Sequence, residues 1–273
     1  MALRRSAARL VLWALPRLLS LSQAYRIYEK YLESQVRRGA VPRHVAIIMD
    51  GNRRWARQKG LPPWLGHDEG ARTAERVLDW CRELGIRVAT LYALSTENLN
   101  RPPEELSQLL SLLQRRLKLL LEDRRVYEHR IRVKVIGDLE LLPAHIRALA
   151  GELERRTASH NSYYLNLAIA YGARRELVEA FRRLVEEVLR GRMRPEDITE
   201  EAIGKFLYTS SLPFPEPDLI LRTAGEYRLS NFLLWQGAYS ELVFMDVPWP
   251  SLRRIDFLRA IRIYQERHRR FGR

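Results

Sequence analysis

The sequence predicts an α/β fold in which a central, mostly parallel six-stranded sheet is flanked by helices. Six apolar runs of strand length alternate with longer segments whose apolar residues recur at helical spacing. Polar residues of unusual kinds directly follow several of these runs, which is typical of the edge where parallel strands end and ligands bind. No linker rich in Gly, Ser or Pro divides the 273 residues. We therefore expect one domain over residues 42–273, preceded by an amphipathic helical extension over residues 1–41.

The expected elements follow in order along the chain. The strands are expected near residues 44–49, 86–93, 131–136, 163–170, 218–222 and 241–246. The helices are expected over residues 70–84, 103–129, 143–159, 173–190, 200–208 and 253–270. Pro102 and Pro103 precede two glutamates and mark a helix start, because a first turn tolerates proline and favours acidic residues. Thr199 is expected to cap the helix 200–208, which starts with two glutamates. Cys81, the single cysteine, is expected in the core.

The net charge of +14 is concentrated at the two ends of the chain. Residues 1–44 contain nine basic and two acidic side chains, and residues 251–273 contain eight and two, so the stretch between them carries only +1. A nucleic-acid enzyme more often spreads basic residues over its whole fold. The distribution favours a membrane surface or a local polyanion site, and a basic nucleic-acid-binding α/β protein is the alternative.

The N-terminal segment has three interpretations. The apolar run 10–16 follows three arginines and is interrupted by Arg17, so it is too short to span a membrane. A signal peptide ending near residues 22–24 is a second interpretation, which Arg17 and the early start of the first strand disfavour. The third is an amphipathic helix on an anionic bilayer with Trp13 facing inward, or the same helix packed on the body or a partner. With one cysteine, which suits a reducing compartment, we expect a cytoplasmic protein held peripherally on the inner face of the membrane.

The first polar cluster ends the apolar run 44–49. Asp50 is suited to hold a hard cation such as Mg²⁺. Gly51 allows close backbone approach and its N–H can face an anion. Arg53 and Arg54 offer forked donors for phosphate oxygens. The cluster predicts a site for a metal–polyphosphate complex, and a strand-to-helix turn with a solvated basic edge is the alternative.

Two further clusters follow later strands. The segment 95–101 offers a hydroxyl, a carboxylate, an amide and a guanidinium within seven residues. In the segment 222–230, Arg222, Arg228 and Ser230 could converge on a second phosphate, with Glu241 as another metal carboxylate. Two anion sites and a metal indicate two phosphorylated substrates, although any α/β protein has polar loops at this edge.

Three ordered motifs make the chain similar, over about residues 42–273, to the cis-prenyltransferases of the undecaprenyl diphosphate synthase family. They are D-G-N-R-R-W-A at 50–56, Y-A-L-S-T-E-N-x-N-R-P at 92–102 and R-T-A-G-E-x-R-L-S-N-F-L-L-W-Q at 222–236. The resemblance implies condensation of isopentenyl diphosphate units onto a farnesyl or geranylgeranyl diphosphate primer. The product would be a long polyprenyl diphosphate, the precursor of a lipid carrier for glycan synthesis. It also implies Mg²⁺ as cofactor and a homodimer.

The resemblance assigns roles residue by residue. Its metal ligands are Asp50, at the allylic diphosphate, and Glu241, at the isopentenyl diphosphate. The residues that position the allylic substrate and assist proton removal are Ser95, Asn98 and Arg101. The allylic diphosphate would be bound by the first motif and a nearby histidine, which are Gly51, Asn52, Arg53, Arg54, Trp55 and His67. Isopentenyl diphosphate would be bound by Arg222, Arg228 and Ser230. A C-terminal R-x-G ending at Gly272 would reach the active site of the neighbouring subunit.

Some positions depart from the family pattern. Pro63 stands where many bacterial members have an arginine, whereas Arg53 replaces a bacterial glycine, resembles archaeal and eukaryotic members and could compensate for the missing charge. Leu99 and Ala224 replace a frequent tryptophan and glycine. Because of these changes, the sequence does not identify which allylic diphosphate is the primer. A non-catalytic prenyltransferase-like subunit is an alternative, but it should have lost Asp50 or its arginines.

The growing hydrocarbon requires an apolar product tunnel. The expected helix 103–129 presents a broad leucine face as one wall of it, with ordinary core packing as the alternative. These leucines are Leu109, Leu110, Leu113, Leu117, Leu120 and Leu121.

Overall fold

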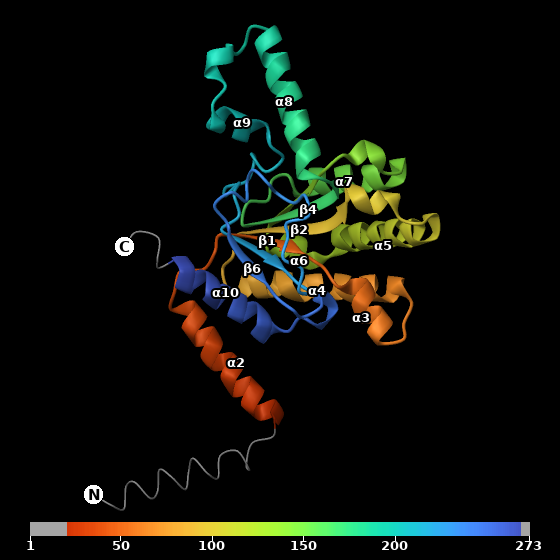
Figure 1. Cartoon of the computed structure of the whole chain (residues 1–273), viewed down its shortest axis with the longest axis vertical. Helices are drawn as coiled ribbons and strands as arrows, with labels where there is room; N and C mark the ends of the chain where they lie inside the picture. Colours follow the sequence, from red (N-terminus) through yellow and green to blue (C-terminus); the bar gives the residue numbers. More distant parts are fainter. Residues whose placement is uncertain (1–20, 269–273) are drawn as a thin grey trace, which may run out of the picture.

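The computed structural model describes residues 21–268, and its centre is one six-stranded sheet (Figure 1). The strands lie in the order β3-β4-β2-β1-β5-β6, and every pairing in the described chain is parallel, which confirms the predicted sheet. Their bounds are β1 His44–Ile48, β2 Val88–Ser95, β3 Ile131–Ile136, β4 Tyr163–Tyr171, β5 Leu219–Arg222 and β6 Glu241–Phe244.

The α-helices agree with the predicted positions except at a few boundaries. They are α2 Leu21–Arg37, α3 Asn52–Gln58, α4 Pro63–Glu83, α5 Pro103–Glu122, α6 Arg124–Glu128, α7 Ala144–Thr157, α8 Ala173–Leu189, α9 Glu200–Phe206 and α10 Arg254–His268. The short α3 was not predicted, because it is mostly polar and has no apolar periodicity. Helix α4 begins earlier than expected, because Pro63 starts it while Trp64 and Leu65 remain exposed and hide the apolar pattern.

The long helix predicted over residues 103–129 is divided in two. The backbone of Asp123 is extended, with ψ of 111°, and its carboxylate accepts a hydrogen bond from the amide of Arg125 at 2.9 Å. Asp123 therefore ends α5 and caps α6, which the continuous apolar pattern concealed. The cap predicted at Thr199 is confirmed, since its Oγ1 accepts from the amide of Ala202 at 3.2 Å.

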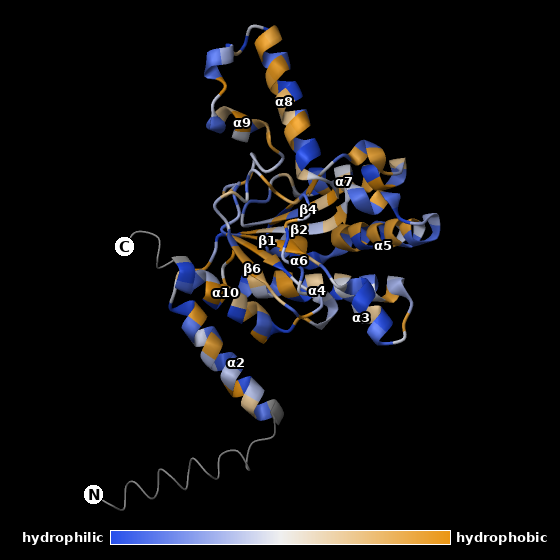
Figure 2. Ribbon diagram, in the orientation of Figure 1, coloured by the Kyte–Doolittle hydropathy of each residue, from blue (hydrophilic) through white to orange (hydrophobic). Residues whose placement is uncertain are grey.

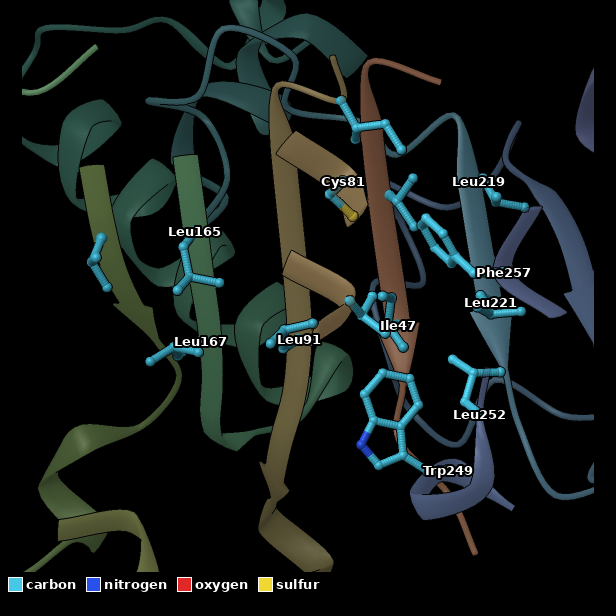
Figure 3. Close-up of a cluster of buried hydrophobic side chains, with 14 of the residues drawn as sticks. Ile47, Cys81, Leu91, Leu165, Leu167, Leu219, Leu221, Trp249, Leu252 and Phe257 are labelled. Carbon is cyan, nitrogen blue, oxygen red and sulfur yellow. The ribbon is translucent and has the colours of Figure 1, made fainter. Parts of the chain in front are cut away.

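Strand β1 is buried on both faces, as its continuous apolar run predicts. On one face, Ile47 packs with Cys81 of α4, Leu117 of α5 and Phe257 of α10. Figure 3 shows Ile47, Cys81 and Phe257 among the buried side chains that cover the strands on this side. Cys81 is 3% exposed, so it is the core residue predicted from its spacing.

The opposite face of the sheet is covered largely by chain that is not helical. Ala46 and Ile48 of β1 pack there with Tyr171 and with Phe232 and Leu233 of the segment between β5 and β6. Helix α8 starts on this side and projects away from the sheet with α9 (Figure 1). Apolar residues, drawn in orange, continue along the part of α8 that projects from the sheet (Figure 2), and four apolar side chains of this helix are exposed.

The predicted N-terminal extension is more closely tied to the domain than its boundary at residue 41 implied. Leu32 and Val36 of α2 are buried in the main core. The Nε2 of Gln265 in α10 donates to the carbonyl of Val36 at 2.8 Å and to that of Ala40 at 3.1 Å. The amphipathic run 10–19 lies outside the described residues. Within residues 21–268, every helix is too short or too polar to cross a bilayer.

The sheet topology determines where a ligand site can form. Strand β1 lies between β2 and β5. The chain leaves β1 through α3 and α4 to reach β2, whereas it leaves β5 toward β6 on the other side. Neighbouring strands whose connections diverge open a crevice at their carboxyl ends. The first and third polar clusters of the sequence follow these two strands.

Candidate active site

Asp50 and Arg222 form an ion pair in the crevice between β1 and β5. The Nη2 of Arg222 lies 2.7 Å from the Oδ2 of Asp50. The Arg222 side chain is 5% exposed and that of Asp50 is 32% exposed. The Oγ1 of Thr223 donates to the Asp50 carbonyl at 2.8 Å and accepts from the Asp50 amide at 3.1 Å. The carboxylate is therefore fixed in position while part of it faces the opening.

Arg222 also organises the segment that follows β5. Its Nη1 donates to the Oγ of Ser230 at 2.6 Å and to the carbonyl of Arg228. Its buried Nε has no partner among the described residues. The structure thus brings together Asp50, Arg222, Arg228 and Ser230, which the sequence placed in two separate clusters.

Glu226 joins the two clusters from the solvent side. One carboxylate oxygen lies 3.2 Å from the Nη2 of Arg54, and the other lies 2.8 Å from the Nη1 of Arg228. Sequence reasoning did not assign Glu226 a role, although a single acid between Arg222 and Arg228 was a signal that could have identified it.

Gly51 adopts a conformation that few other residues tolerate. Its φ is 97°, and a Cβ at this position would lie 2.8 Å from the Cβ of Ala224 and 3.0 Å from the Cα of Pro248. Its amide donates to the Oδ1 of Asp50 at 2.7 Å, so in this structure the N–H faces the carboxylate rather than the anion expected from the sequence. Ala224, which replaces a frequent glycine, also has a left-handed φ of 71°.

The turn after β2 is held by a reciprocal pair of hydrogen bonds. The Oγ of Ser95 accepts from the amide of Asn98 at 3.2 Å, and the Oδ1 of Asn98 accepts from the amide of Ser95 at 3.1 Å. The Nδ2 of Asn98 has no partner in the described part of the chain and is free to donate. Arg101 and Arg53 both approach Glu105, at 2.8 Å and 3.6 Å.

His67 on α4 is neutral at physiological pH. Burial, together with the nearby charges of Arg101 and Arg53, lowers its pKa from 6.5 to about 4. Its buried Nε2 has no hydrogen-bond partner within residues 21–268. A buried nitrogen without a partner beside two guanidinium groups is suited to meet a polar group of a ligand.

These side chains form the mouth of a cavity of about 1100 Å³. Twelve of the predicted site residues line it, namely Asp50, Gly51, Asn52, Arg53, Arg54, His67, Ser95, Asn98, Arg101, Arg222, Arg228 and Ser230. The apolar part of its wall includes Leu78, Leu91, Leu109, Leu113, Leu117 and Leu120. Leu110 and Leu121 of the predicted leucine face belong instead to the core. Part of the leucine face therefore lines the cavity, and the other part is ordinary core packing.

Two predicted site residues of the described chain, Trp55 and Glu241, do not line this cavity. Glu241 begins β6 and pairs with Leu219, so it lies about 10 Å along the strands from the level of Arg222 at roughly 3.3 Å per residue. Its carboxylate lies 3.3 Å from the Nη1 of Arg267. Within the described chain, Glu241 therefore lies away from Asp50, and its assignment as a metal ligand at the isopentenyl diphosphate stays a prediction. Gly272 lies outside the described residues.

The cavity, its cationic mouth and the three motifs agree with one family of proteins. The family model described as putative undecaprenyl diphosphate synthase matches residues 48–272. The chain belongs to this family. It is therefore a cis-prenyltransferase that elongates an allylic primer, as its motifs predicted, and not a non-catalytic relative.

Archaeal relatives are similar over almost the whole chain. The tritrans,polycis-undecaprenyl-diphosphate synthase (geranylgeranyl-diphosphate specific) of Pyrococcus furiosus is 53% identical over 92% of this chain and 94% of its own. The enzyme of that name from Methanopyrus kandleri is 51% identical over 93% of each chain.

Solved structures share the fold. Lavandulyl diphosphate synthase from Lavandula x intermedia, in complex with dimethylallyl diphosphate, is 35% identical with a TM-score of 0.78, over 82% of this chain and 95% of its own. A probable undecaprenyl diphosphate synthase from Campylobacter jejuni is 34% identical with a TM-score of 0.70, over 86% of this chain and 100% of its own.

Proposed function

We propose that this enzyme condenses isopentenyl diphosphate units onto geranylgeranyl diphosphate and releases a long polyprenyl diphosphate for a lipid carrier in glycan synthesis. One observation carries the proposal: a single cavity is lined both by the arginines of the three motifs and by leucines of α4, β2 and α5. A diphosphate with a hydrocarbon tail has the same two parts. The choice of geranylgeranyl over farnesyl diphosphate follows the names of the archaeal relatives.

Two groups of donors are available for two diphosphates. Arg228 and Ser230, organised by Arg222, would bind isopentenyl diphosphate. Arg53, Arg54 and the free Nδ2 of Asn98 would bind the allylic diphosphate on the other side of Asp50. Guanidinium groups are suited to this because their forked donors match phosphate oxygens. Holding both substrates in fixed orientation is itself a large part of catalysis.

The site can supply part of the ligand set of Mg²⁺, with the substrate phosphates supplying the rest. No group of three or more acidic, histidine or cysteine side chains that could hold a metal occurs within residues 21–268. Mg²⁺ is commonly bound by one or two carboxylates together with substrate phosphates, and the partly exposed carboxylate of Asp50 can supply this share. When bound there, Mg²⁺ would neutralise charge on the departing diphosphate. Arg222 meanwhile compensates the Asp50 charge from the buried side.

The apolar interior would hold the growing chain. At about 1100 Å³ the cavity is slightly larger than the roughly 300–1,000 Å³ usual for small-molecule sites. Leucines from α4, β2 and α5 line much of its wall. We propose that this cavity is the predicted product tunnel, in which each added isoprene unit moves the tail further from the mouth.

We also propose that the enzyme acts as a homodimer. Along α8, an apolar stripe defined by Val178, Phe181, Val185 and Leu189 repeats every three or four residues. Each of these side chains is between 47% and 81% exposed. An exposed apolar stripe on a projecting helix is typical of a contact surface. A dimer would also provide the neighbouring site that the motif ending at Gly272 is predicted to reach.

Attachment to the inner face of the membrane is a further proposal. On α2, Tyr25, Ile27, Tyr28 and Tyr31 are all more than 40% exposed, and Arg26 and Lys30 lie between them. Tyrosine rings with basic neighbours suit the interface of an anionic bilayer. A polyprenyl product must enter a bilayer, so this attachment would place the exit of the product near its destination.

Incubation with isopentenyl diphosphate, Mg²⁺ and each primer in turn tests the proposed reaction. We expect long polyprenyl diphosphates from geranylgeranyl diphosphate and a lower kcat/KM with farnesyl diphosphate, measured by chromatography of labelled products. Faster elongation of farnesyl diphosphate would overturn the primer assignment. Absence of product with either primer, together with salt-sensitive binding of oligonucleotides, would favour the nucleic-acid alternative instead.

A further inference from the structure

One hydrogen bond joins the two loops that carry the diphosphate-binding side chains. The Nδ2 of Asn231 donates to the Oε1 of Glu97 at 3.0 Å. Asn231 directly follows Ser230 in the loop after β5, and Glu97 directly precedes Asn98 in the turn after β2. Both residues line the cavity. Strands β2 and β5 are not neighbours, because β1 lies between them. The contact therefore bridges the crevice.

The side chain of Asn231 is fixed by more than this one contact. Its Oδ1 accepts from the amide of Arg174 at 2.9 Å, and its carbonyl accepts from the amide of Ala173 at 2.8 Å. Both N–H groups belong to the first turn of α8, where the helix itself supplies no acceptor. Asn231 accepts their hydrogen bonds and is thereby anchored at the start of the helix. Its φ of 63° is left-handed, a conformation that asparagine tolerates better than most residues.

The approach of the two loops also depends on a glycine. A Cβ on Gly172 would lie 2.7 Å from the Nδ2 of Asn231 and 2.8 Å from the Oγ1 of Thr96. Gly172 therefore leaves the space in which the amide of Asn231 reaches the turn at Thr96 and Glu97. Three segments distant in sequence are packed around one amide group.

We propose that Asn231 and Glu97 are positioning residues that set the separation of the two bound diphosphates. The inference rests on the proposed function, because it takes the two loops to hold the two substrates. The bond has an ionised acceptor and is of the stronger kind. In a reaction between two bound substrates, a displacement of about 1 Å can cost on the order of 100-fold in rate. Loosening the bond should therefore lower kcat while each substrate still binds its own loop.

Asn231→Asp is the sharpest single test. A carboxylate can still accept from the amide of Arg174, so the start of α8 keeps its partner. It can no longer donate to Glu97 and repels it across about the same distance. We expect kcat to fall about tenfold or more, because the effects of side chains in direct contact are energetically coupled. The Kd values for isopentenyl diphosphate and for a non-ionising thio analogue of the allylic primer should change less than threefold.

The double variant Asn231→Asp, Glu97→Gln distinguishes positioning from mere folding. Its new amide can donate to the new carboxylate, which restores the bond in the opposite direction. We expect kcat within about threefold of the wild type. Asn161→Asp, the same chemical change on an exposed residue at the far end of β4, is the matched control and should leave kcat unchanged.

Several results would overturn the inference. They are a wild-type kcat in Asn231→Asp, a double variant as slow as the single one, or a loss confined to the affinity for one substrate. If Asn231→Asp does not fold, the exposed Glu97 provides the test: Glu97→Ala should lose kcat and Glu97→Gln should keep it. Equal activity of those two variants would contradict the proposal. A wild-type enzyme that forms no product from the two diphosphates would instead refute the proposed function.

Discussion

At the scale of single residues, the site depends on Arg222, whose guanidinium touches both clusters predicted from the sequence. It pairs with Asp50 on one side and holds Ser230 and the Arg228 carbonyl on the other. Because Arg222 is nearly fully buried and Asp50 is not, removal of the carboxylate would leave a buried charge with too few partners. A variant at position 50 must therefore preserve hydrogen bonding if it is to report on the metal.

Asp50→Asn should abolish most turnover and retain the fold. The amide oxygen can still accept from Gly51 or Arg222, but it is a poor ligand for a hard cation. We expect kcat to fall at least 100-fold, or about 3 kcal/mol of barrier. Steady-state kinetics and thermal unfolding measure the two effects. Asp50→Ala should lower thermal stability further. Near-normal condensation by Asp50→Asn at saturating Mg²⁺ would show that this carboxylate is not the ligand.

The two arginines after β5 should behave differently, although the sequence alone suggested that both would act only on isopentenyl diphosphate. Arg228 contacts Glu226 and faces the cavity. We expect Arg228→Ala to raise the KM for isopentenyl diphosphate roughly tenfold or more, and the KM for the primer much less. Arg222→Ala removes the partner of Asp50 and should impair both substrates. Varying each substrate in turn tests this, and an equal effect of Arg228→Ala on both would reject two separate pockets.

At the scale of elements, the two ends of β1 have different uses. Its carboxyl end leads to the active site. At its amino end, His44 is fully buried, with Nδ1 2.9 Å from the carbonyl of Phe214 and Nε2 2.8 Å from the Oγ1 of Thr90. This is consistent with a neutral ring that donates through one nitrogen and accepts through the other. Burial lowers the pKa of His44 to about 4.

This histidine should make folding stability depend on pH. Because its folded pKa lies below the ordinary 6.5, the unfolded chain binds the proton first. The stabilisation is complete above about pH 6.5 and is lost as pH falls toward 4, by on the order of 3 kcal/mol in all. Urea unfolding at pH 7 and pH 4.5 should show a smaller loss in His44→Gln than in the wild type. If the free energy of unfolding falls equally in the variant and the wild type, His44 does not titrate in this range.

Truncation should separate the two parts of the N-terminal segment. Deletion of residues 1–20 keeps α2 and should leave stability within about 1 kcal/mol. Deletion of residues 1–40 also removes the buried Leu32 and Val36, each contributing about 1.5–3 kcal/mol. It should therefore destabilise the protein, contrary to the sequence-based expectation that the folded domain begins at residue 42. Thermal unfolding of both forms measures this, and equal midpoints would contradict the packing role of α2.

Deletion of residues 1–20 also tests the proposed attachment to the membrane. If residues 1–20 are the interfacial helix, their deletion should weaken co-sedimentation with anionic liposomes, and binding of the intact chain should fall with salt. Retained binding would assign the attachment to the tyrosines of α2. No binding by the intact chain would reject the membrane proposal.

At the scale of the whole molecule, the sequence predicted the sheet and most of the site because both depend on local signals. Apolar runs marked the strands, and parallel strands bring their carboxyl ends together whatever the loops between them do. Twelve site residues consequently meet at one cavity. Glu241 lies away from this cavity, because its place relative to Arg222 depends on the register of β6, which no local pattern specifies. Glu226 and Asn231 were overlooked because their partners lie far away in sequence.

Within residues 21–268, the stripe on α8 is an apolar surface that a single chain leaves exposed. Phe181 is at its centre and is 47% exposed, so a charge there should not disturb the fold of one subunit. In a dimer, the same charge would be buried without a partner, which typically costs more than 2 kcal/mol. Phe181→Asp should therefore weaken the dimer at least 30-fold in sedimentation equilibrium, while its thermal unfolding at high concentration remains cooperative.

Leu61→Asp is the matched control, since Leu61 is an exposed apolar residue in the loop between α3 and α4, far from α8 (Figure 1). It should leave self-association unchanged. If Phe181→Asp dimerises as tightly as the wild type, the stripe is not the interface. If it is monomeric and still fully active, the subunits do not complete one another's sites. Loss of activity in step with the loss of dimer would mean that each catalytic site needs the second chain, as the predicted contribution of Gly272 requires.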